Sequence, residues 1–349
     1  MKLTVKEMTY RISVIVPTYK RPDLLHQCLG ALTMQDLDPS DYEIIVVDDA
    51  ASEVTRQQVD QWNECMHRGK CEGCPAHTIR YIAVTGSHGP SAARNVGWRA
   101  ARGDIIAFTD DDCLPTPGWL RSGLSVFSDE VVGATGKLVM PLVHIPTDYE
   151  RDATWLEKSE FVTANCFYRR DMLERVGGFD ERFTAAWRED SDLFFTLRKY
   201  VEKNGCGNPE LLSAFVYVPK AVVIHPVRPA PWGISIRQQR KSMYNALLYK
   251  KHPVAYRERI QAAPPWHYYC ILGALLVAIG SALAGFWLFA LGAFTVWMFM
   301  TGRFCLLRLR GTSHAPVHIM EMIVTSIVIP LLSIFWRIVG AVRFRVFFL

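Results

Sequence analysis

The stretch "GDIIAFTDDDC", residues 103–113, places three carboxylates directly after a run of apolar residues. A short continuous apolar run with β-branched residues is typical of a strand that is buried on both faces of a sheet. Adjacent carboxylates repel one another, so the triplet Asp110, Asp111 and Asp112 requires either a compensating cation or a well-solvated turn. Pro115 follows closely, which leaves open the simpler interpretation of a solvated turn that leads into a helix.

Two earlier stretches repeat this arrangement, "RISVIVPTYKR" at 11–21 and "YEIIVVDDAAS" at 42–52. Helical patterns lie between the runs, at 22–35, 52–64 and 91–103. Strands that alternate with helices predict an α/β fold with a mostly parallel sheet, in which the carboxyl ends of the strands open into one crevice. The polar residues expected to meet there with the triplet are Thr18, Tyr19, Arg21, Asp48 and Asp49.

A crevice lined by Asp48, Asp49 and the triplet would be strongly negative. Mg²⁺ and Mn²⁺ bind carboxylate oxygens and commonly complete their coordination with substrate phosphates. The sequence therefore predicts a divalent cation that bridges to a phosphorylated ligand. Neither a GxxxxGK[ST] loop nor a GxGxxG fingerprint is present, which argues against a P-loop NTPase and against a dinucleotide-dependent dehydrogenase.

Five stretches together resemble the family 2 glycosyltransferases, which have the GT-A fold. They cover roughly residues 11–200 in the family's order: "SVIVPTYKRPDLL", "YEIIVVDDAAS", "GPSAARNVGWRAARGDIIAFTDDDCLP", "TANCFYRRDMLERVGGFDERF" and "REDSDLFFTLR". The resemblance implies a Rossmann-like domain that transfers a sugar from a nucleotide-diphospho-sugar with inversion at the anomeric carbon.

The resemblance also implies roles for individual residues. Asp110 and Asp112 form the DXD motif: Asp110 faces the ribose and the metal, Mn²⁺ or Mg²⁺, and Asp112 binds the metal directly. Asp111 lies where the hydroxyls of the donor sugar are usually read. His225 follows a later apolar run and is expected as a further metal ligand; an ordinary histidine at a strand end is the alternative. The other residues expected at the nucleotide are Pro17, Thr18, Tyr19, Arg21, Asp49 and Arg94.

Glu189 and Asp190 stand before an amphipathic helical pattern. On the residues alone, acids at this position are explained by their favourable interaction with the helix dipole. In the resembled family the aspartate of the pair is the general base that takes the proton of the acceptor hydroxyl, so Asp190 is the expected base. Trp187 is a candidate platform for the acceptor, and core packing is an equally fair account of it.

One departure from the family bears on the product. Processive synthases carry a QxxRW motif, whereas the nearest stretch here, "IRQQRKS" at 236–242, has no tryptophan after the arginine. This favours transfer of one sugar or a few to a lipid-linked or cell-surface glycan acceptor. The alternatives are a processive polysaccharide synthase that also translocates its product, and a sugar-nucleotide-binding membrane scaffold without turnover. A UDP-sugar is the expected donor, and GDP- and dTDP-sugars stay open.

The C-terminal part, from about residue 263 to 349, has the composition of a membrane domain. No charged residue occurs from Tyr268 to Gly302, a length that exceeds the ~20 residues of one spanning helix and suits a hairpin. A further apolar segment lies at about 319–342. The first residues lack the apolar region of a signal peptide, so residues 1–262 are expected on the cytosolic side of the inner cell membrane.

The topology of this part is contradictory on the sequence alone. The arginines of residues 303–310 favour a cytosolic loop after the hairpin, and Arg343 and Arg345 favour a cytosolic C-terminus. A third spanning segment would place these two groups on opposite sides. A re-entrant last segment with its turn at Pro330 would resolve the conflict, and the sequence does not choose between the two topologies.

Two further patterns are less specific. Basic and apolar residues share a helical spacing over about 234–252, which predicts an amphipathic helix on an anionic leaflet or, alternatively, a solvated helix packed on the domain. The net charge of +5 forms no other basic patch with interleaved aromatics, so nucleic acid is not an expected partner. A structural Zn²⁺ site is also considered in the insertion 65–77, although the usual second tight cysteine pair is missing; its ligands would be Cys65, Cys71, Cys74 and His77.

Overall fold

The structure is a computed structural model, and it describes residues 10–67, 79–204 and 214–348. The chain divides into two compact units. The first unit comprises residues 1–141 and 156–226, and the second comprises residues 142–155 and 227–349. The second unit therefore begins before the expected boundary at residue 262 and takes in a segment from the middle of the chain.

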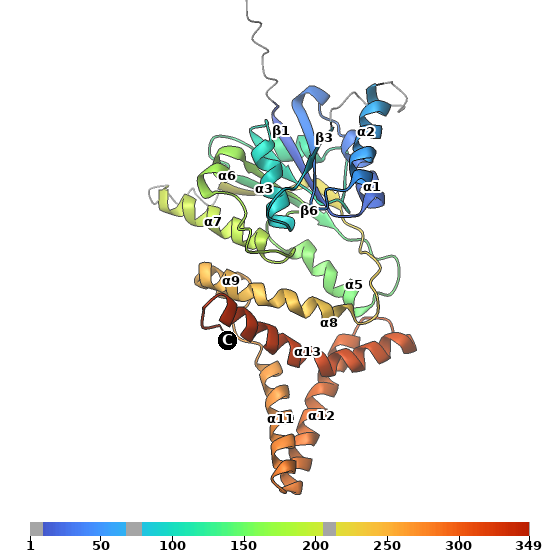
Figure 1. Cartoon of the computed structure of the whole chain (residues 1–349), viewed down its shortest axis with the longest axis vertical. Helices are drawn as coiled ribbons and strands as arrows, with labels where there is room; N and C mark the ends of the chain where they lie inside the picture. Colours follow the sequence, from blue (N-terminus) through green and yellow to red (C-terminus); the bar gives the residue numbers. More distant parts are fainter. Residues whose placement is uncertain (1–9, 68–78, 205–213, 349) are drawn as a thin grey trace, which may run out of the picture. The chain divides into compact units, whose positions relative to one another are not determined.

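The first unit is built on one eight-stranded sheet with the order β3-β2-β1-β4-β7-β6-β8-β5 (Figure 1). The pairs β1–β2, β2–β3, β1–β4 and β6–β8 are parallel, whereas β4–β7, β6–β7 and β5–β8 are antiparallel. The strands are β1 (Ile12–Thr18), β2 (Tyr42–Asp48), β3 (Ile79–Ala83), β4 (Ile105–Phe108), β5 (Leu114–Pro115), β6 (Gly133–Val139), β7 (Cys166–Arg169) and β8 (Phe215–Ile224).

The helices of this unit connect and cover the strands. Gly97 on α3 is required for close packing, because a Cβ there would lie 2.4 Å from the side chain of Ile15 on β1. The central strands read as continuous apolar runs because they are buried, and Ile15, Val46 and Phe108 are fully buried. The helices are α1 (Pro22–Thr33), α2 (Glu53–His67), α3 (Pro90–Ala100), α4 (Trp119–Leu124), α6 (Arg170–Val176) and α7 (Glu189–Asn204), with 3₁₀ turns η1 (Pro39–Asp41) and η2 (Thr154–Lys158).

The predicted α/β fold is confirmed, as are the long apolar helices near the C-terminus. The prediction of a mostly parallel sheet holds for its first half only. β7 runs antiparallel to both of its neighbours, β4 and β6, so the second half of the sheet is mixed. The sequence around β7, "CFYR", alternates no differently from a parallel strand of this length, which is why strand direction could not be derived from it.

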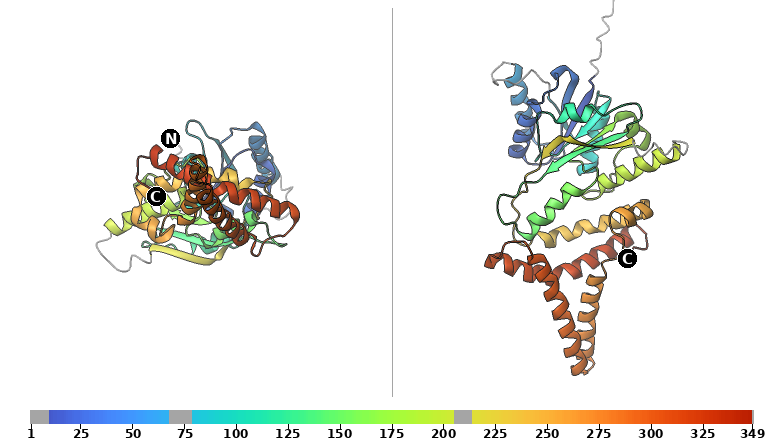
Figure 2. Two further views of the ribbon diagram at one scale, coloured as in Figure 1. Left: turned by 90° about the horizontal axis from the view of Figure 1, so that it is seen from below. Right: turned by 180° about the vertical axis from the view of Figure 1, so that it is seen from behind.

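The second unit is helical in the part that the structure describes. Its three longest helices are α11 (Trp266–Leu283), α12 (Trp287–Leu309) and α13 (Pro316–Arg343), and each is long and apolar enough to cross a membrane. α11 and α12 form a hairpin, and α13 runs across the open end of that hairpin rather than alongside it (Figures 1 and 2). The shorter elements are α5 (Asp148–Ala153), α8 (Ile234–Gln238), η4 (Gln239–Met243), α9 (Tyr244–Lys251) and α10 (Pro253–Arg259).

α13 continues through Pro330, so the alternative of a re-entrant turn at that residue is wrong. Residues 234–251 are helical without a break, as α8, η4 and α9. Their apolar residues Met243 and Leu247 are buried against α13, which favours the alternative of a packed helix. Gly340 of α13 makes this packing possible, because a Cβ there would lie 2.4 Å from the carbonyl oxygen of Met243.

Candidate active site

The ends of three neighbouring parallel strands bring the predicted polar clusters together. β1 lies between β2 and β4, and Thr18 at the end of β1 is in register with Asp48 of β2. Thr18 donates a hydrogen bond through Oγ1 to Oδ2 of Asp111, 2.8 Å away, just beyond the end of β4. The expected convergence of strand ends is therefore present in the structure.

Asp111 is held inside the site and not at its opening. Its side chain is almost fully buried, and besides Thr18 it pairs with Nη1 of Arg21 at 3.2 Å. Burial raises the pKa of Asp111 to about 6, although Arg21 and Thr18 both favour its ionised form. The role of Asp111 in binding the donor sugar stays a prediction. Its contacts connect the "PTYKR" turn to the loop of Asp110, Asp111 and Asp112, here called the acidic loop.

Asp48 and Asp49 have different hydrogen-bond partners and therefore different roles. Asp48 is fully buried and accepts hydrogen bonds from the backbone N–H groups of Ala50 and Ser52, 2.9 and 2.7 Å away. This pattern shapes the turn after β2. Asp49 is the residue expected at the nucleotide base, and it contacts Nδ1 of His88 at 2.9 Å. His88 had no predicted role, since no residue pattern sets it apart.

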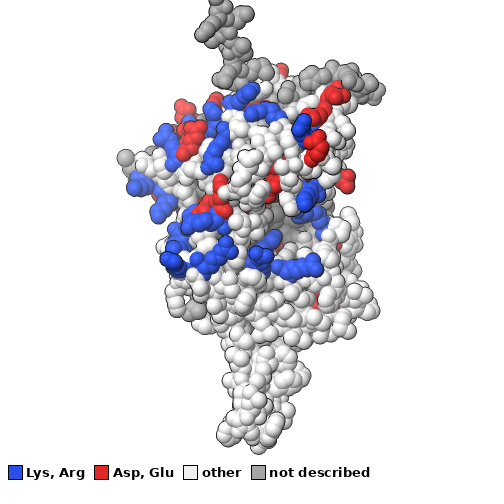
Figure 3. Space-filling view, in the orientation of Figure 1, with Lys and Arg blue, Asp and Glu red and all other residues white. Residues whose placement is uncertain are grey.

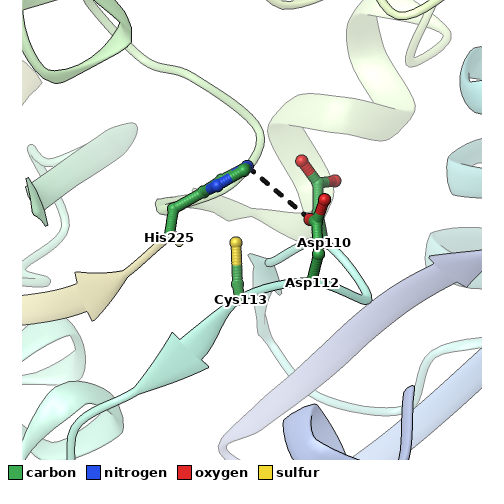
Figure 4. A group of neighbouring side chains, drawn as sticks. All are labelled: Asp110, Asp112, Cys113 and His225. Atoms are coloured by element: carbon green, nitrogen blue, oxygen red, sulfur yellow. Dashed lines mark ion pairs between the residues drawn. The ribbon is translucent and has the colours of Figure 1, made fainter. Parts of the chain in front are cut away.

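Four possible metal donors lie together where the acidic loop meets the residue after β8 (Figure 4). One ligand atom from each of Asp110, Asp112, Cys113 and His225 lies within 4.8 Å of the others. The antiparallel pairing of Leu114 with Ile224 explains the grouping, because it sets the residues before β5 beside the residue after β8. Nε2 of His225 is 3.6 Å from Oδ1 of Asp112, so the structure brings together all three residues predicted as metal ligands.

The donor set fits a divalent cation. Two carboxylates and an imidazole are ligands that Mn²⁺ accepts, and the sulfur of Cys113 adds a softer fourth donor. Cys113 was missed by the sequence analysis, although it directly follows the triplet. It is fully buried, and its Sγ points toward the gap between His225 and Asp112 (Figure 4).

Arg94 connects the acidic loop to the predicted catalytic pair. Its guanidinium donates from Nη2 to Oδ1 of Asp110 at 2.7 Å and from Nη1 to Oε1 of Glu189 at 3.0 Å. Arg94 is only 2% exposed and Glu189 only 3%. The side chain was expected beside the nucleotide; in the structure its two Nη groups are committed to carboxylates, and it positions both of them.

Glu189 and Asp190 form the first turn of α7, where the helix N-terminus favours negative charge. Burial nevertheless raises the pKa of Glu189 to about 7, with Asp190 raising it further and Arg94 opposing. Burial also raises the pKa of Asp190, against hydrogen bonds from Ser191. Both Ser191 N–H and Oγ donate to Oδ1 of Asp190, at 2.6 and 3.2 Å.

The residues before this pair have an unusual backbone. Arg188 has a φ of 76°, in the left-handed region that non-glycine residues seldom occupy. Its guanidinium lies 4.6 Å from the ring centre of Trp187, whose side chain is 40% exposed. Exposure argues against the alternative of core packing for Trp187, and its place at the acceptor stays a prediction.

Other predicted residues lie at the rim or outside the described residues. Tyr19 is exposed, and Pro17 lies within β1. Cys71, Cys74 and His77 fall outside the described residues. The zinc site stays a prediction.

Comparison with known proteins agrees with this geometry. The profile of glycosyl transferase family 2 matches residues 13–181. The chain is 29% identical over 178 residues to Glycosyltransferase AglE of Haloferax volcanii, covering 48% of this chain and 55% of that protein. It is 30% identical over 205 residues to Poly(ribitol-phosphate) beta-N-acetylglucosaminyltransferase TarS of Staphylococcus aureus, covering 56% and 33%. The chain spans about half the length of the first curated relatives it matches, 55% and 48%.

Solved structures with a similar chain trace include mannosyltransferase PcManGT from Pyrobaculum calidifontis in complex with GDP-Man and Mn²⁺. It has a TM-score of 0.48 and 18% identity, with 90% of this chain and 86% of that chain covered. TarS 1–349 of S. aureus in complex with UDP-GlcNAc has a TM-score of 0.47 and 15% identity, with 87% and 93% covered. The resemblance predicted from the motifs is confirmed by the family model, because residues 13–181 match glycosyl transferase family 2.

Proposed function

We propose that this chain transfers a sugar from a nucleotide-diphospho-sugar to a lipid-linked or membrane-proximal glycan acceptor. The transfer depends on a divalent metal, inverts the anomeric carbon, and uses Asp190 as the general base. The apolar helices of the second unit anchor the chain to a membrane, with the catalytic unit on the cytosolic side. A tether of this kind raises the local concentration of a membrane-bound acceptor.

One observation supports this proposal above the others. Arg94 joins Asp110 of the predicted DXD motif to Glu189, the neighbour of the predicted base, through two hydrogen bonds of 2.7 and 3.0 Å. A donor diphosphate at Asp110 and Asp112 and an acceptor hydroxyl at Asp190 would therefore meet in one crevice. A scaffold that only bound the nucleotide sugar would not require a buried, positioned carboxylate pair on α7.

The residues divide the reaction between them. Ser191 holds Oδ1 of Asp190, which leaves Oδ2 to take the proton from the acceptor hydroxyl as that oxygen attacks the anomeric carbon. Glu189 is bonded to Arg94, so it orients the pair and is not itself the base. Asp110, Asp112 and His225 would hold the cation, which when bound supplies positive charge to the departing nucleoside diphosphate.

The donor class is supported by the relatives. The S. aureus relative TarS is named an N-acetylglucosaminyltransferase, and the Streptomyces hygroscopicus relative is named a glucosyltransferase. Glucose and N-acetylglucosamine are therefore the first donor sugars to test, as UDP-sugars, the donor class that the family resemblance implies. The acceptors in those names differ from one another, so they do not identify the acceptor of this chain.

The test is release of nucleotide by the detergent-purified full chain. UDP-, GDP- and dTDP-sugars are supplied one at a time, with Mn²⁺, Mg²⁺ or EDTA, and donor binding is measured in parallel. Release from one donor that EDTA abolishes supports the proposal and identifies the nucleotide. Absence of both donor binding and release across the panel, with the protein shown to be folded, would overturn it.

A further inference from the structure

The second unit buries polar side chains and exposes apolar ones along α13. Every exposed residue from Val317 to Val342 on this helix is apolar, and these residues share one face. They are Val317, Met320, Ile323, Ile327, Phe335, Ile338 and Val342. The opposite face is buried and carries His318, Thr325, Ser326, Ser333 and Arg337. An exposed apolar stripe of this length requires an apolar surrounding.

The contacts of α13 show at what level of a membrane it could lie. Arg308 sits one residue before the end of α12, and its Nη1 donates to Oγ1 of Thr325 at 2.7 Å and to Oγ of Ser326 at 3.2 Å. The middle of α13 therefore meets the open end of the hairpin and not the middle of α12. A helix that crossed the bilayer beside the hairpin would place its middle next to the middle of α12.

A basic segment follows α13 along most of its length. The N–H of Gly233, before α8, donates to Oε1 of Glu321 at 2.7 Å. Further along, Arg240 lies 5.9 Å from the ring centre of Trp336. Nζ of Lys250, in α9, then donates to the carbonyl oxygen of Phe344 at 2.8 Å.

This basic segment cannot enter hydrocarbon together with α13. Arg237, Arg240 and Lys250 are exposed, and a charged side chain is costly to place at the bilayer centre. Lys and Arg side chains gather over the α8–α9 segment, whereas the hairpin carries no charged residue from Tyr268 to Gly302 (Figure 3). The charges and the stripe of α13 thus mark two adjacent levels, headgroups and acyl chains.

We infer that α13 lies in the plane of the membrane interface with its apolar stripe toward the acyl chains, and that within the described chain only the α11–α12 hairpin enters the hydrocarbon core. The partner of this surface is the lipid bilayer, with anionic headgroups at the α8–α9 segment. The arrangement resolves the conflict of charges, because the arginines at 303–310 and at 343–345 then lie on one side. This inference rests on the membrane anchoring in the proposed function but not on the transfer reaction.

The decisive experiment uses the native full chain with a different protease-cleavable tag at each end, reconstituted into sealed vesicles. A hairpin and an in-plane helix leave both ends on one side, so each molecule loses both tags or neither, whatever its orientation. A spanning α13 places the ends on opposite sides, so each molecule loses one tag. That second result would overturn the inference, as would extraction of the protein by alkali, since the hairpin would then not be inserted.

A depth measurement provides a second test within the same unit. Met320, Ile327 and Ile338 are replaced singly by cysteine in a chain that lacks other cysteines, and each is labelled with a fluorophore. Nitroxides at shallow lipid positions are expected to quench all three alike. Leu276, in α11, is the matched control because its exposure of 59% resembles the 57% of Ile338, and deep nitroxides should quench it best. A label at Ile327 that is far deeper than the other two would contradict the in-plane position. Nucleotide release from the native tagged chain of the first experiment, which keeps Cys113, reports separately on the catalytic proposal.

Discussion

The sheet of the first unit and α13 of the second unit differ in the side chains that they leave exposed. In the sheet of the first unit, Ile15 and Val46 are fully buried, and polar residues collect where strands end. In α13 of the second unit, Ser326 and Arg337 are buried while Ile338 is exposed. The contrast shows that the burial rule depends on the solvent: water covers the first unit, and lipid would cover the outer face of α13. Buried charged residues also differ in role: in the first unit they belong to the candidate active site, and in the second unit they stabilise the packing of helices.

The sharpest test of the catalytic use is Asp190→Asn. Loss of the general base should lower kcat about 10²–10⁴-fold, because the acceptor hydroxyl would keep its proton during attack. Donor affinity and thermal stability should change little, since the amide has the same shape. Glu202→Gln is the matched control, a carboxylate-to-amide change at the exposed far end of the same helix. Transfer at the parental rate would remove Asp190 from the mechanism.

The corresponding change in the second unit is Arg308→Met. Arg308 is buried and donates from Nη2 to Oδ2 of Asp148 at 2.7 Å, so its removal takes away the nearer of the two arginines that pair with this carboxylate. Because Arg151 still pairs with Asp148 at 2.9 Å, we expect a loss of about 3 kcal/mol in stability, the lower end for a broken buried pair. Thermal unfolding in detergent measures the effect, with Arg310→Met, an exposed arginine near the same helix end, as the control.

The double variant Arg308→Met with Asp148→Leu makes this test more specific. Replacing a buried pair by apolar side chains of similar volume is often neutral, so most of the lost stability should return. If the single variant is as stable as the parent, the ion pair does not hold the 142–155 segment in the second unit. If the double variant is no better than the single one, the hydrogen bonds of Arg308 to Thr325 and Ser326 carry more of the stability than the pair itself.

Arg94→Gln examines the link between the two carboxylate groups. The variant loses the bonds to Asp110 and Glu189, and displacement of groups at a reacting centre can lower the rate about 10²-fold. Removing the positive charge should also move the acid limb of the pH–rate profile to higher pH, because Arg94 lowers the pKa values of both Glu189 and Asp190. Arg99→Gln on the same helix is the control, and it should leave the profile in place. An unshifted acid limb in Arg94→Gln would contradict this positioning role.

The parent chain should show activity and stability that depend on pH in opposite directions. Burial raises the pKa of Glu189 to about 7 and raises the pKa of Asp190, so the base loses its charge at a higher pH than a free carboxyl group does. We expect kcat/KM to decline on that acid side. The folded state binds more protons than the unfolded chain between the ordinary carboxyl pKa of 4.5 and about 7, so stability should fall as the pH rises through that window. Thermal unfolding in EDTA across this range measures the stability. Kinetics with the metal present, in the same buffers, measure kcat/KM.

Much of the first unit could be predicted because its pattern is local. Apolar runs followed by Thr18, Asp48 or Asp110 require only that parallel strands end at one edge of a sheet. The contacts of Arg94 and Cys113 could not be predicted in the same way. The contacts of Cys113 depend on the pairing of β5 with β8, and those of Arg94 depend on α3 lying close to the start of α7. Contacts between distant segments leave no periodic trace in the sequence.

The second unit was predictable in composition but not in arrangement. A stripe of apolar residues faces lipid both in a spanning helix and in one that lies in the plane, so the sequence of α13 fits either position. The distinction comes from the contacts of Ser326 with α12 and of Phe344 with α9, which the sequence does not reveal. The 142–155 segment is a similar case, because contacts with distant residues assign it to the second unit. They include the ion pair of Asp148 with Arg308 and the hydrogen bond from the Ser313 N–H to the carbonyl oxygen of Pro146.

The smallest expected effect compares two exposed apolar residues of similar accessibility, Val54 at 60% in the first unit and Ile338 at 57% in α13. Val54→Asn should be nearly neutral, within about 0.5 kcal/mol, because water already covers that side chain. Ile338→Asn should modestly weaken the association of α13 with lipid, because the amide would have to move from water to acyl chains. Hydrogen exchange of residues 316–343 in lipid nanodiscs detects the difference: exchange should quicken in Ile338→Asn and stay unchanged in Val54→Asn. Equal exchange in both variants would mean that the exposed face of α13 meets water, and the contrast between the two units would then lose its physical basis.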